Sequence, residues 1–353
     1  MKYSVTVSTS KSVTENFCMK RLCLLILYTI LITGCQQSHS KMSLTNNGVQ
    51  NSYTQENNWL HLPDGYAMGT PTGLGLDSNG HIFIFSRAGR EWTMLVPVPS
   101  TPISGKTIHE IDAVTGTLIN SWGDHFFVMP HGLTVDADNN IWVTDVALHQ
   151  VFKFSHQGKL LMTLGEAGKA GNDVAHFNMP TGVAVAKDGS FYVSDGYGNS
   201  RVVKFSANGK YLFEWGTKGG RANEFDIPHA IELDDKDRVY VADRENKRIQ
   251  VFDSNGRWLK IIEDKSFGNL CAVVFDTNAK HLMAVDDMIS MGVNHKGSDV
   301  IIFDTACTSF TTFGRTGNYN GPVCWYHDIA TDKQGNIYVA DLLNGIVQKF
   351  KKK

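Results

Sequence analysis

The feature that most constrains the fold of this chain is a sequence unit that recurs six times in 353 residues. Each clear copy has an apolar run, a polar turn and a second apolar run. Five copies begin near Pro71, Pro130, Pro180, Pro228 and Tyr326, and the most degraded copy covers 270–276. Most copies continue into a third and a fourth apolar strand. Four short strands in each repeat of roughly 40–50 residues are typical of β-propeller blades.

The last repeat ends near Phe350 with only three strands. We expect residues 58–62 to supply the fourth, because closing the ring in this way removes two exposed sheet edges. The sequence therefore predicts an all-β fold, a six-bladed β-propeller closed by an N-terminal strand. Aspartates recur where the second strand ends and are expected to hold turns; they are Asp145, Asp195, Asp243 and Asp341.

The start of the chain is predicted to be a targeting segment. Lys20 and Arg21 precede an apolar run over 22–32, which is shorter than the about 20 residues that a membrane-spanning helix needs. The run leads to Cys35 in the sequence Ile-Thr-Gly-Cys, which resembles a bacterial lipoprotein cleavage site with a lipidated cysteine. An ordinary signal peptide is the alternative. Met19 is a candidate for the true start.

These features divide the chain into a signal peptide over 1–35, a flexible tether over 36–53 and a propeller over 54–353. We expect an exported monomer in the bacterial cell envelope that touches a membrane only through a lipid on Cys35. The other cysteines of the mature chain are Cys271, Cys307 and Cys324, so at most one disulfide can form. The net charge of −2, with mixed signs, gives no basis for nucleic-acid binding.

Three histidines occupy equivalent positions in alternate repeats. His131, His229 and His327 each open an apolar run, and successive members are 98 residues apart. The first strand of a propeller blade borders the central channel, so the residue that enters this strand faces the axis. In order around the ring, that position is held by Thr72, His131, Thr181, His229, Cys271 and His327.

Imidazoles on alternate blades of a six-unit ring would converge on the axis at about 120° to one another. Three neutral histidine nitrogens that leave a fourth coordination position open are typical of a catalytic zinc site. Any one of these histidines alone could be structural. Together they favour a metal and an enzyme.

Longer runs of the sequence resemble one enzyme family. The run Phe-Phe-Val-Met-Pro-His-Gly-Leu-Thr-Val-Asp over 126–136 is similar to peptidyl-α-hydroxyglycine α-amidating lyase, as are residues 142–154, 194–201 and 241–246. The resemblance extends from about Leu60 to Phe350 and weakens between about 286 and 312.

The resemblance implies a six-bladed propeller of NHL-type repeats that cleaves a C-terminal α-hydroxyglycine into a peptide amide and glyoxylate. The expected substrate is thus a peptide or small molecule that ends in α-hydroxyglycine. The expected cofactors are Zn²⁺ and a structural Ca²⁺. By position, the implied functional residues are the zinc ligands His131, His229 and His327, the base Tyr197, the active-site arginines Arg87 and Arg244, and, for calcium, the backbone carbonyls of Leu74 and Leu133 with the carboxylate of Asp328.

The chain departs from this family at a few positions. The two disulfides of animal members are absent together, since their positions hold Asn178 with Gly198 and Tyr240 with Val251. Ser86 stands in place of a usual histidine, and Trp-Tyr rather than Met-Pro precedes His327. These differences bear on substrate preference more than on the chemistry.

Other functions remain open from the sequence. A non-catalytic NHL-type propeller would bind protein or glycan and would not need three axial histidines. A calcium-dependent lactonase-like propeller would carry Glu, Asp and Asn at the axis, where this chain has His, Thr and Cys. A lyase or hydrolase of the same fold could also act on a small hydroxyglycine-like compound.

Overall fold

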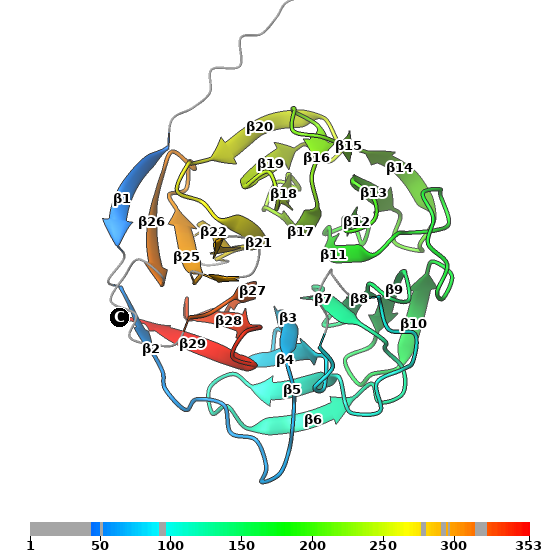
Figure 1. The fold of residues 1–353 in the computed structure, drawn as a ribbon, viewed down its shortest axis with the longest axis vertical. Helices are drawn as coiled ribbons and strands as arrows, with labels where there is room; N and C mark the ends of the chain where they lie inside the picture. Colours follow the sequence, from blue (N-terminus) through cyan, green and yellow to red (C-terminus); the bar gives the residue numbers. More distant parts are fainter. Residues whose placement is uncertain are drawn as a thin grey trace, which may run out of the picture. The chain divides into compact units, whose positions relative to one another are not determined.

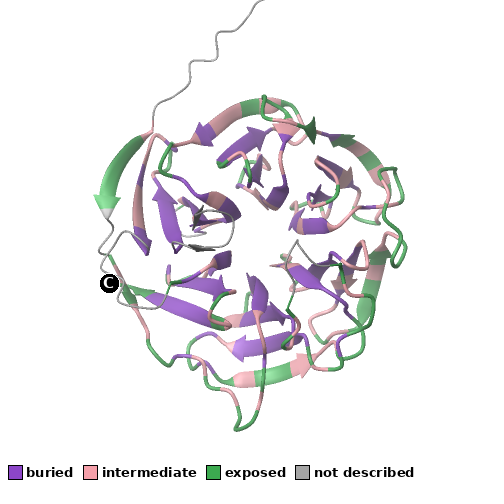
Figure 2. Ribbon diagram, viewed as in Figure 1, coloured by how far each residue is buried: buried purple, intermediate pink, exposed green. Residues whose placement is uncertain are grey.

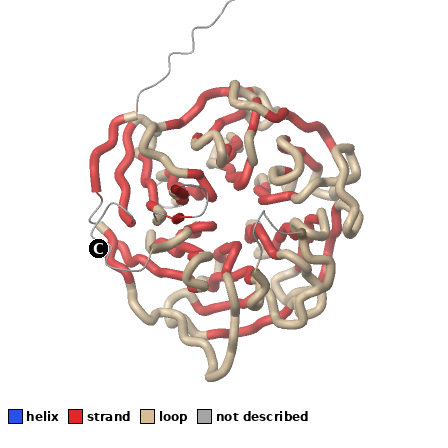
Figure 3. The backbone as a smooth tube through the Cα atoms, in the orientation of Figure 1, coloured by secondary structure: helices blue, strands red, loops and turns tan. Residues whose placement is uncertain are grey.

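Six β-sheets follow one another around a ring, and each is built mainly from four antiparallel strands (Figure 1). The computed structural model describes residues 44–49, 52–91, 97–276, 280–290, 294–295, 297–314 and 323–353. These residues fall in the unit Met42–Lys353. Every regular element among them is a strand (Figure 3), so this part of the chain contains no helix that could cross a membrane. The predicted signal peptide, with Cys35, lies outside the described residues.

The strands fall into four groups by their place in the blade. The innermost strands are β3 (Pro71–Leu76), β7 (Pro130–Val135), β11 (Pro180–Val185), β17 (Pro228–Leu233), β21 (Asn269–Phe275) and β27 (Tyr326–Thr331). The second strands are β4 (His81–Ser86), β8 (Ile141–Asp145), β12 (Phe191–Asp195), β18 (Val239–Asp243), β22 (Leu282–Asp287) and β28 (Ile337–Asp341). The third strands are β5 (Ile108–Asp112), β9 (Gln150–Phe154), β13 (Arg201–Phe205), β19 (Arg248–Phe252), β25 (Asp299–Phe303) and β29 (Ile346–Lys352). The outer strands are β6 (Leu118–Trp122), β10 (Leu160–Leu164), β14 (Tyr211–Trp215), β20 (Trp258–Glu263), β26 (Ser309–Gly314) and β2 (Tyr53–Gln55).

Three smaller pieces complete the described strands. β1 (Thr45–Val49) is a fifth strand on the sheet that contains β26. Two short pairs lie in connections and join β15 (Thr217–Lys218) to β16 (Glu224–Phe225) and β23 (Ile289–Ser290) to β24 (Asn294–His295).

The innermost strands close the ring. Each one contacts the innermost strand of the next blade, and β27 of the last blade contacts β3 of the first. This arrangement confirms the predicted all-β fold with six propeller blades.

The strand that completes the last blade differs from the prediction. β2 pairs antiparallel with β29, with Thr54 opposite Lys351, so the N-terminal side of the chain does complete this sheet. The predicted segment, 58–62, instead packs between blades: the Trp59 indole is buried, donates to the Ala113 carbonyl at 3.1 Å and contacts the Tyr338 ring. Its apolar pattern therefore reflects core packing rather than a strand.

The predicted flexible tether over 36–53 also differs from the structure at its C-terminal end. β1 runs parallel to β26, with Thr45 opposite Ser309. Among the described residues, strand pairing is therefore present from Thr45 onward, nine residues before the predicted start of the propeller at residue 54. The polar composition of this strand hid it, because its side chains at residues 45–48 are exposed.

The inner strands of the blades are mostly buried, whereas much of the outer rim is exposed (Figure 2). The buried side chains form clusters that join neighbouring blades, such as the second and the third. The second strands of the second and third blades, β8 and β12, are buried along their whole length because both faces are covered, which explains their continuous apolar runs. Trp142 of one blade packs on Phe191 of the next, with ring centroids 4.5 Å apart, and Trp215 packs on Phe252 at 5.4 Å. These aromatic contacts hold neighbouring blades together.

The recurrent aspartates hold turns, as predicted. The Asp145 carboxylate accepts four backbone N–H groups, from Val128, Met129, Ala147 and Leu148. It thereby fixes the loop that leads into β7, the strand on which His131 lies.

Candidate metal centre and active site

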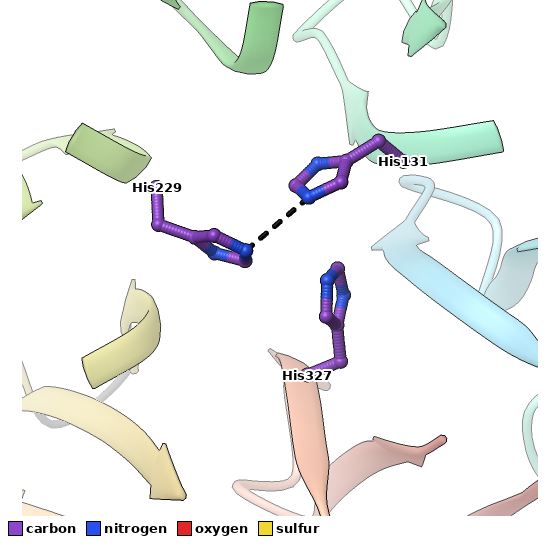
Figure 4. Close-up of side chains that lie close together, drawn as sticks. All are labelled: His131, His229 and His327. Carbon is purple, nitrogen blue, oxygen red and sulfur yellow. Dashed lines mark hydrogen bonds between the residues drawn. The ribbon is translucent and has the colours of Figure 1, made fainter. Parts of the chain in front are cut away.

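His131, His229 and His327 are each the second residue of an innermost strand, on β7, β17 and β27. Their rings point toward one another (Figure 4), with centroids 4.7 to 4.9 Å apart. The side chains are buried, and their ring nitrogens can be chosen so that all lie within 4.8 Å of one another. The six predicted axial residues all line one central cavity of about 270 Å³.

A backbone carbonyl of the following blade orients each histidine. The Nδ1 atoms of His131, His229 and His327 lie 2.8, 2.6 and 2.6 Å from the carbonyl oxygens of Thr181, Cys271 and Thr72. A carbonyl only accepts hydrogen bonds, so Nδ1 carries the hydrogen and Nε2 keeps its lone pair.

Gly132 makes the close approach at the first of these carbonyls feasible. A Cβ on this residue would lie 2.4 Å from the Thr181 oxygen, which is the acceptor for His131. Any larger residue would push the two blades apart at this point.

The spacing of the Nε2 atoms fits a metal ion. The Nε2 atoms of His131 and His229 are 3.2 Å apart (Figure 4), and a tetrahedral Zn²⁺ would hold two nitrogens about 3.3 Å from each other. With the hydrogens on Nδ1, this approach brings two lone pairs together, and a cation between them would relieve their repulsion. The donor set therefore suits zinc.

Burial keeps the three histidines neutral. It lowers the pKa of His131 and of His229 well below the usual value, and neighbouring imidazoles and Arg244 act in the same direction. Burial likewise lowers the pKa of His327 to about 3. Neutral imidazole is the form that binds metals.

Tyr197 lies directly against the histidines. Its hydroxyl is 3.1 Å from Nε2 of His131 and 3.0 Å from Nε2 of His229. The residue lies just beyond the end of β12, which is paired with the start of β11, so the antiparallel register brings it to the histidine end of the ring. Burial raises the pKa of Tyr197, and Arg244 and Arg87 oppose this rise.

The two predicted arginines lie at the same end of the blades. Arg87 and Arg244 directly follow β4 and β18, and both are largely buried. Nε of Arg87 donates to the Pro130 carbonyl at 3.2 Å, next to His131. Arg244 donates through Nη1 to Glu245 at 2.6 Å, while its buried Nε has no hydrogen-bond partner among the described residues.

The predicted calcium ligands lie in the same central cavity, which Leu74, Leu133 and Asp328 all line. The Asp328 carboxylate accepts the backbone N–H groups of Leu74 at 2.7 Å and Ile329 at 2.9 Å. Burial raises its pKa to about 7, and the nearby Glu232 carboxylate adds to this effect.

Glu232 is a site residue that the sequence analysis missed. It lines the same cavity, and burial raises its pKa to about 7 as well. The sequence feature that could have revealed it is a charged residue within the apolar run Ile-Glu-Leu, on the innermost strand of a blade. Two buried carboxylates in one cavity are costly without a cation.

The departures from the family pattern are accommodated locally. Ser86 donates to the Met68 carbonyl at 2.6 Å and contacts Nε2 of the buried His109 at 2.9 Å. Cys271, Cys307 and Cys324 are all free and buried, so no disulfide forms among the described residues.

Comparison with known proteins agrees with this architecture. The NHL repeat model matches residues 127–154, 177–205 and 225–252, which lie in the second, third and fourth blades. Two solved structures share the fold at low sequence identity. A virginiamycin B lyase from Staphylococcus aureus has a TM-score of 0.54 at 14% identity, covering 85% of this chain and 88% of that one. A gluconolactonase from Xanthomonas campestris has a TM-score of 0.55 at 13% identity, covering 82% and 88%. These likenesses show the fold alone.

Curated relatives have higher identity. The chain is 36% identical over 300 residues to peptidyl-glycine alpha-amidating monooxygenase B of Xenopus laevis, covering 80% of this chain but only 34% of that protein. It is 33% identical over 292 residues to peptidyl-alpha-hydroxyglycine alpha-amidating lyase 2 of Drosophila melanogaster, covering 78% of this chain and 70% of that protein. It is 42% identical over 196 residues to a probable lyase of the same name in Caenorhabditis elegans, covering 52% and 56%. This chain belongs to the peptidyl-α-hydroxyglycine α-amidating lyase family.

Proposed function

We propose that this protein is a zinc-dependent lyase that cleaves the C–N bond of a peptidyl-α-hydroxyglycine to give a peptide amide and glyoxylate. One observation carries the proposal: ring nitrogens of three buried histidines converge, and the Tyr197 hydroxyl lies within 3.1 Å of Nε2 of two of them. The names of the Drosophila and Caenorhabditis relatives support this substrate.

The reaction requires three events at a carbinolamide. The α-hydroxyl loses its proton, the carbonyl of glyoxylate forms as the C–N bond breaks, and the departing nitrogen takes up a proton. A zinc ion held by His131, His229 and His327 would supply a Lewis acid for the hydroxyl oxygen. Tyr197, as the tyrosinate, is placed to accept the hydroxyl proton and then to return a proton to the nitrogen.

The two arginines stabilise the negative charges of this reaction, on the tyrosinate and on the substrate carboxylate. Arg87 and Arg244 both lower the pKa of Tyr197 against the effect of burial, which favours the tyrosinate form. The unpartnered Nε of Arg244 is a buried donor for a substrate oxygen. We assign the glyoxylate carboxylate to these guanidinium groups, which bind carboxylates with two parallel hydrogen bonds.

We also propose a structural Ca²⁺ in the central cavity, held by the backbone carbonyls of Leu74 and Leu133 and by Asp328. The buried carboxylates of Asp328 and Glu232 support a cation there, since both have pKa values raised to about 7. Oxygen ligands of this kind suit calcium rather than zinc.

We further propose that the protein is exported as a monomer and anchored through a lipid on Cys35. The basic residues, the short apolar run and the Ile-Thr-Gly-Cys sequence support this location. In a bacterial host, the full chain should partition with membranes and the Cys35→Ser chain should not. Equal partitioning of the two would contradict the anchor.

The substrate assignment is tested with three compounds and zinc-loaded protein. We expect glyoxylate and an amide from a peptidyl-α-hydroxyglycine, slower release from a small hydroxyglycine-like compound, and no opening of a sugar lactone. Mass spectrometry of the amide product identifies the bond that is cleaved. Faster turnover of the small compound would move the assignment to that class, and turnover of the lactone alone would contradict a lyase.

A further inference from the structure

A second group of metal-type side chains lies where the first and second blades meet. Asp77 and His81 are in and beside the turn between β3 and β4, Glu110 is on β5, and His156 is in the turn between β9 and β10. We call these four residues the interblade cluster. Asp77 follows the last residue of β3, whereas Thr72 near its start faces the axial histidines, so the cluster lies toward the other end of the blade.

The four side chains each offer one ligand atom, and these atoms lie within 4.8 Å of one another. Nδ1 of His81 is 2.8 Å from Oε1 of Glu110 and 3.6 Å from Oδ2 of Asp77. Nε2 of His156 is 2.8 Å from Oδ2 of Asp77 and 3.7 Å from Oε1 of Glu110. A tetrahedral zinc ion would hold neighbouring ligand atoms about 3.3 Å apart, which lies within this range.

The carboxylates are buried and the histidines reach solvent. The side chain of Asp77 is 0% exposed and that of Glu110 is 7% exposed, while His81 and His156 are 26% and 20% exposed. The N–H groups of Asn79 and His81 bind Oδ1 of Asp77, which orients its Oδ2 toward the cluster. An ion could therefore enter from solvent past the two imidazoles.

Other blades of this chain place a lysine where this blade has Glu110. Glu110 lies opposite Phe83 in its sheet, and the residues at the same register in three other blades are Lys153, Lys204 and Lys349. Lys153 forms an ion pair with the turn aspartate Asp136 at 3.2 Å. The first blade thus has a negative charge, that of Glu110, where other blades have a positive one beside the turn aspartate, which is Asp77 in this blade.

The first blade also lacks a ring donor that other blades give to this aspartate. Trp142 donates to Asp136 at 2.9 Å and Tyr338 donates to Asp332 at 3.0 Å. Phe83, at the same position, has no N–H or O–H group and cannot donate a hydrogen bond. His156 of the neighbouring blade instead approaches Asp77 and stacks edge-on against Phe83.

The two replacements leave two buried carboxylates facing two imidazoles, with no lysine between them. Buried carboxylates need a positive charge nearby, and a metal ion held by all four side chains would supply it. We propose that the interblade cluster binds a divalent transition-metal ion of the zinc class, with two nitrogen and two oxygen ligands, and that this ion ties the second blade to the first. Two imidazoles favour zinc over calcium or magnesium.

Metal counting tests this site apart from the axial one. The His229→Ala chain is loaded with micromolar ZnCl₂, desalted and analysed by inductively coupled plasma mass spectrometry. We expect about one zinc ion per chain in His229→Ala and none in His229→Ala with His156→Ala. His176→Ala is the matched control. His176 also lies beside two carboxylates, but it contacts Glu166 through Nε2 and Asp173 through Nδ1, so one metal ion could not bind all three side chains.

A second variant keeps the test informative if the double variant fails to fold. Glu110→Lys restores the residue that other blades carry, so we expect it to fold and to bind one zinc ion fewer than the parent chain. Circular dichroism checks folding of each chain. Zinc should raise the Tm of His229→Ala and should leave the Tm of the same chain with Glu110→Lys unchanged.

Equal zinc content in His229→Ala with and without His156→Ala would overturn the site, as would no zinc in folded His229→Ala. So would full zinc content in folded Glu110→Lys. None of these outcomes bears on the lyase activity, because the cluster contains no residue assigned to the reaction. A parent chain that binds zinc at the interblade cluster but releases no glyoxylate would instead contradict the proposed function alone.

Discussion

At the scale of single residues, the axial histidines are oriented by their neighbours rather than by their own strands. Each Nδ1 meets a carbonyl of the following blade, which turns each Nε2 toward the axis. The 98-residue spacing predicted that these residues meet. It could not predict the carbonyl partners or the buried Glu232, because both depend on how adjacent blades are rotated against each other.

The hydroxyl of Tyr197 should matter for turnover and not for metal binding. We expect Tyr197→Phe to retain its zinc and to lose about 10²- to 10⁴-fold in kcat, the usual contribution of a positioned acid–base group. Zinc analysis and glyoxylate release measure the two effects. Tyr192→Phe is the control, since the Tyr192 hydroxyl binds the Ser254 carbonyl away from the histidines. A Tyr197→Phe chain with parental kcat would remove this residue from the mechanism.

Asp328 should make the calcium-free protein less stable as the pH rises. Its pKa is about 7 in the folded chain against the usual 3.8, chiefly because it is buried. Between these values the unfolded state has lost the proton and the folded state has not, so the free energy of unfolding falls as the pH rises through this window and levels off above about 7.

The measurement is the difference in Tm between the parent and Asp328→Asn across this pH range. Taking the difference removes the opposite effect of the axial histidines, which both chains share. We expect the Tm of Asp328→Asn to rise relative to the Tm of the parent as the pH rises. We expect Ca²⁺ to raise the Tm of the parent only. A difference that does not change with pH would show that Asp328 is ionised throughout.

At the scale of elements, paired aromatic rings hold each blade against the next. The recurring apolar runs predicted where the second strands lie, and in the second and third blades the structure buries every residue of these strands. The same apolar signal misled the prediction at 58–62, because a buried tryptophan between blades and a closing strand have similar local sequences. The exposed polar strand β1 gave no signal, since its pairing uses backbone groups.

Trp142 should be among the residues on which stability depends most. The Trp142 ring is 1% exposed and packs on Phe191, so we expect Trp142→Ala to lower the free energy of unfolding by about 3–5 kcal/mol. Leu160→Ala, on an outer strand where Leu160 is 43% exposed, should change it by less than about 0.5 kcal/mol. Urea denaturation measures both. Similar losses in the two variants would contradict a core that lies between blades.

At the scale of the whole ring, the stability of the described unit should depend on the N-terminal strands that cover the outer edges of the fifth and sixth blades. β2 covers the edge of β29, and β1 covers the edge of β26. A chain that begins just before Thr45 should keep the Tm of the mature protein. A chain that begins after Gln55 should melt at a lower temperature and aggregate, because two edges are then exposed. Thermal melts with light scattering measure this, and equal Tm values would show that closure contributes little.

The most direct test of the central claim is zinc-dependent glyoxylate release. Protein stripped of metal is assayed on a peptidyl-α-hydroxyglycine before and after Zn²⁺ is added back, in parallel with folded His229→Ala. The axial site predicts activity that returns with zinc in the parent and in Glu110→Lys, and no activity in His229→Ala. Parent protein that contains zinc at the three histidines and releases no glyoxylate would contradict the account.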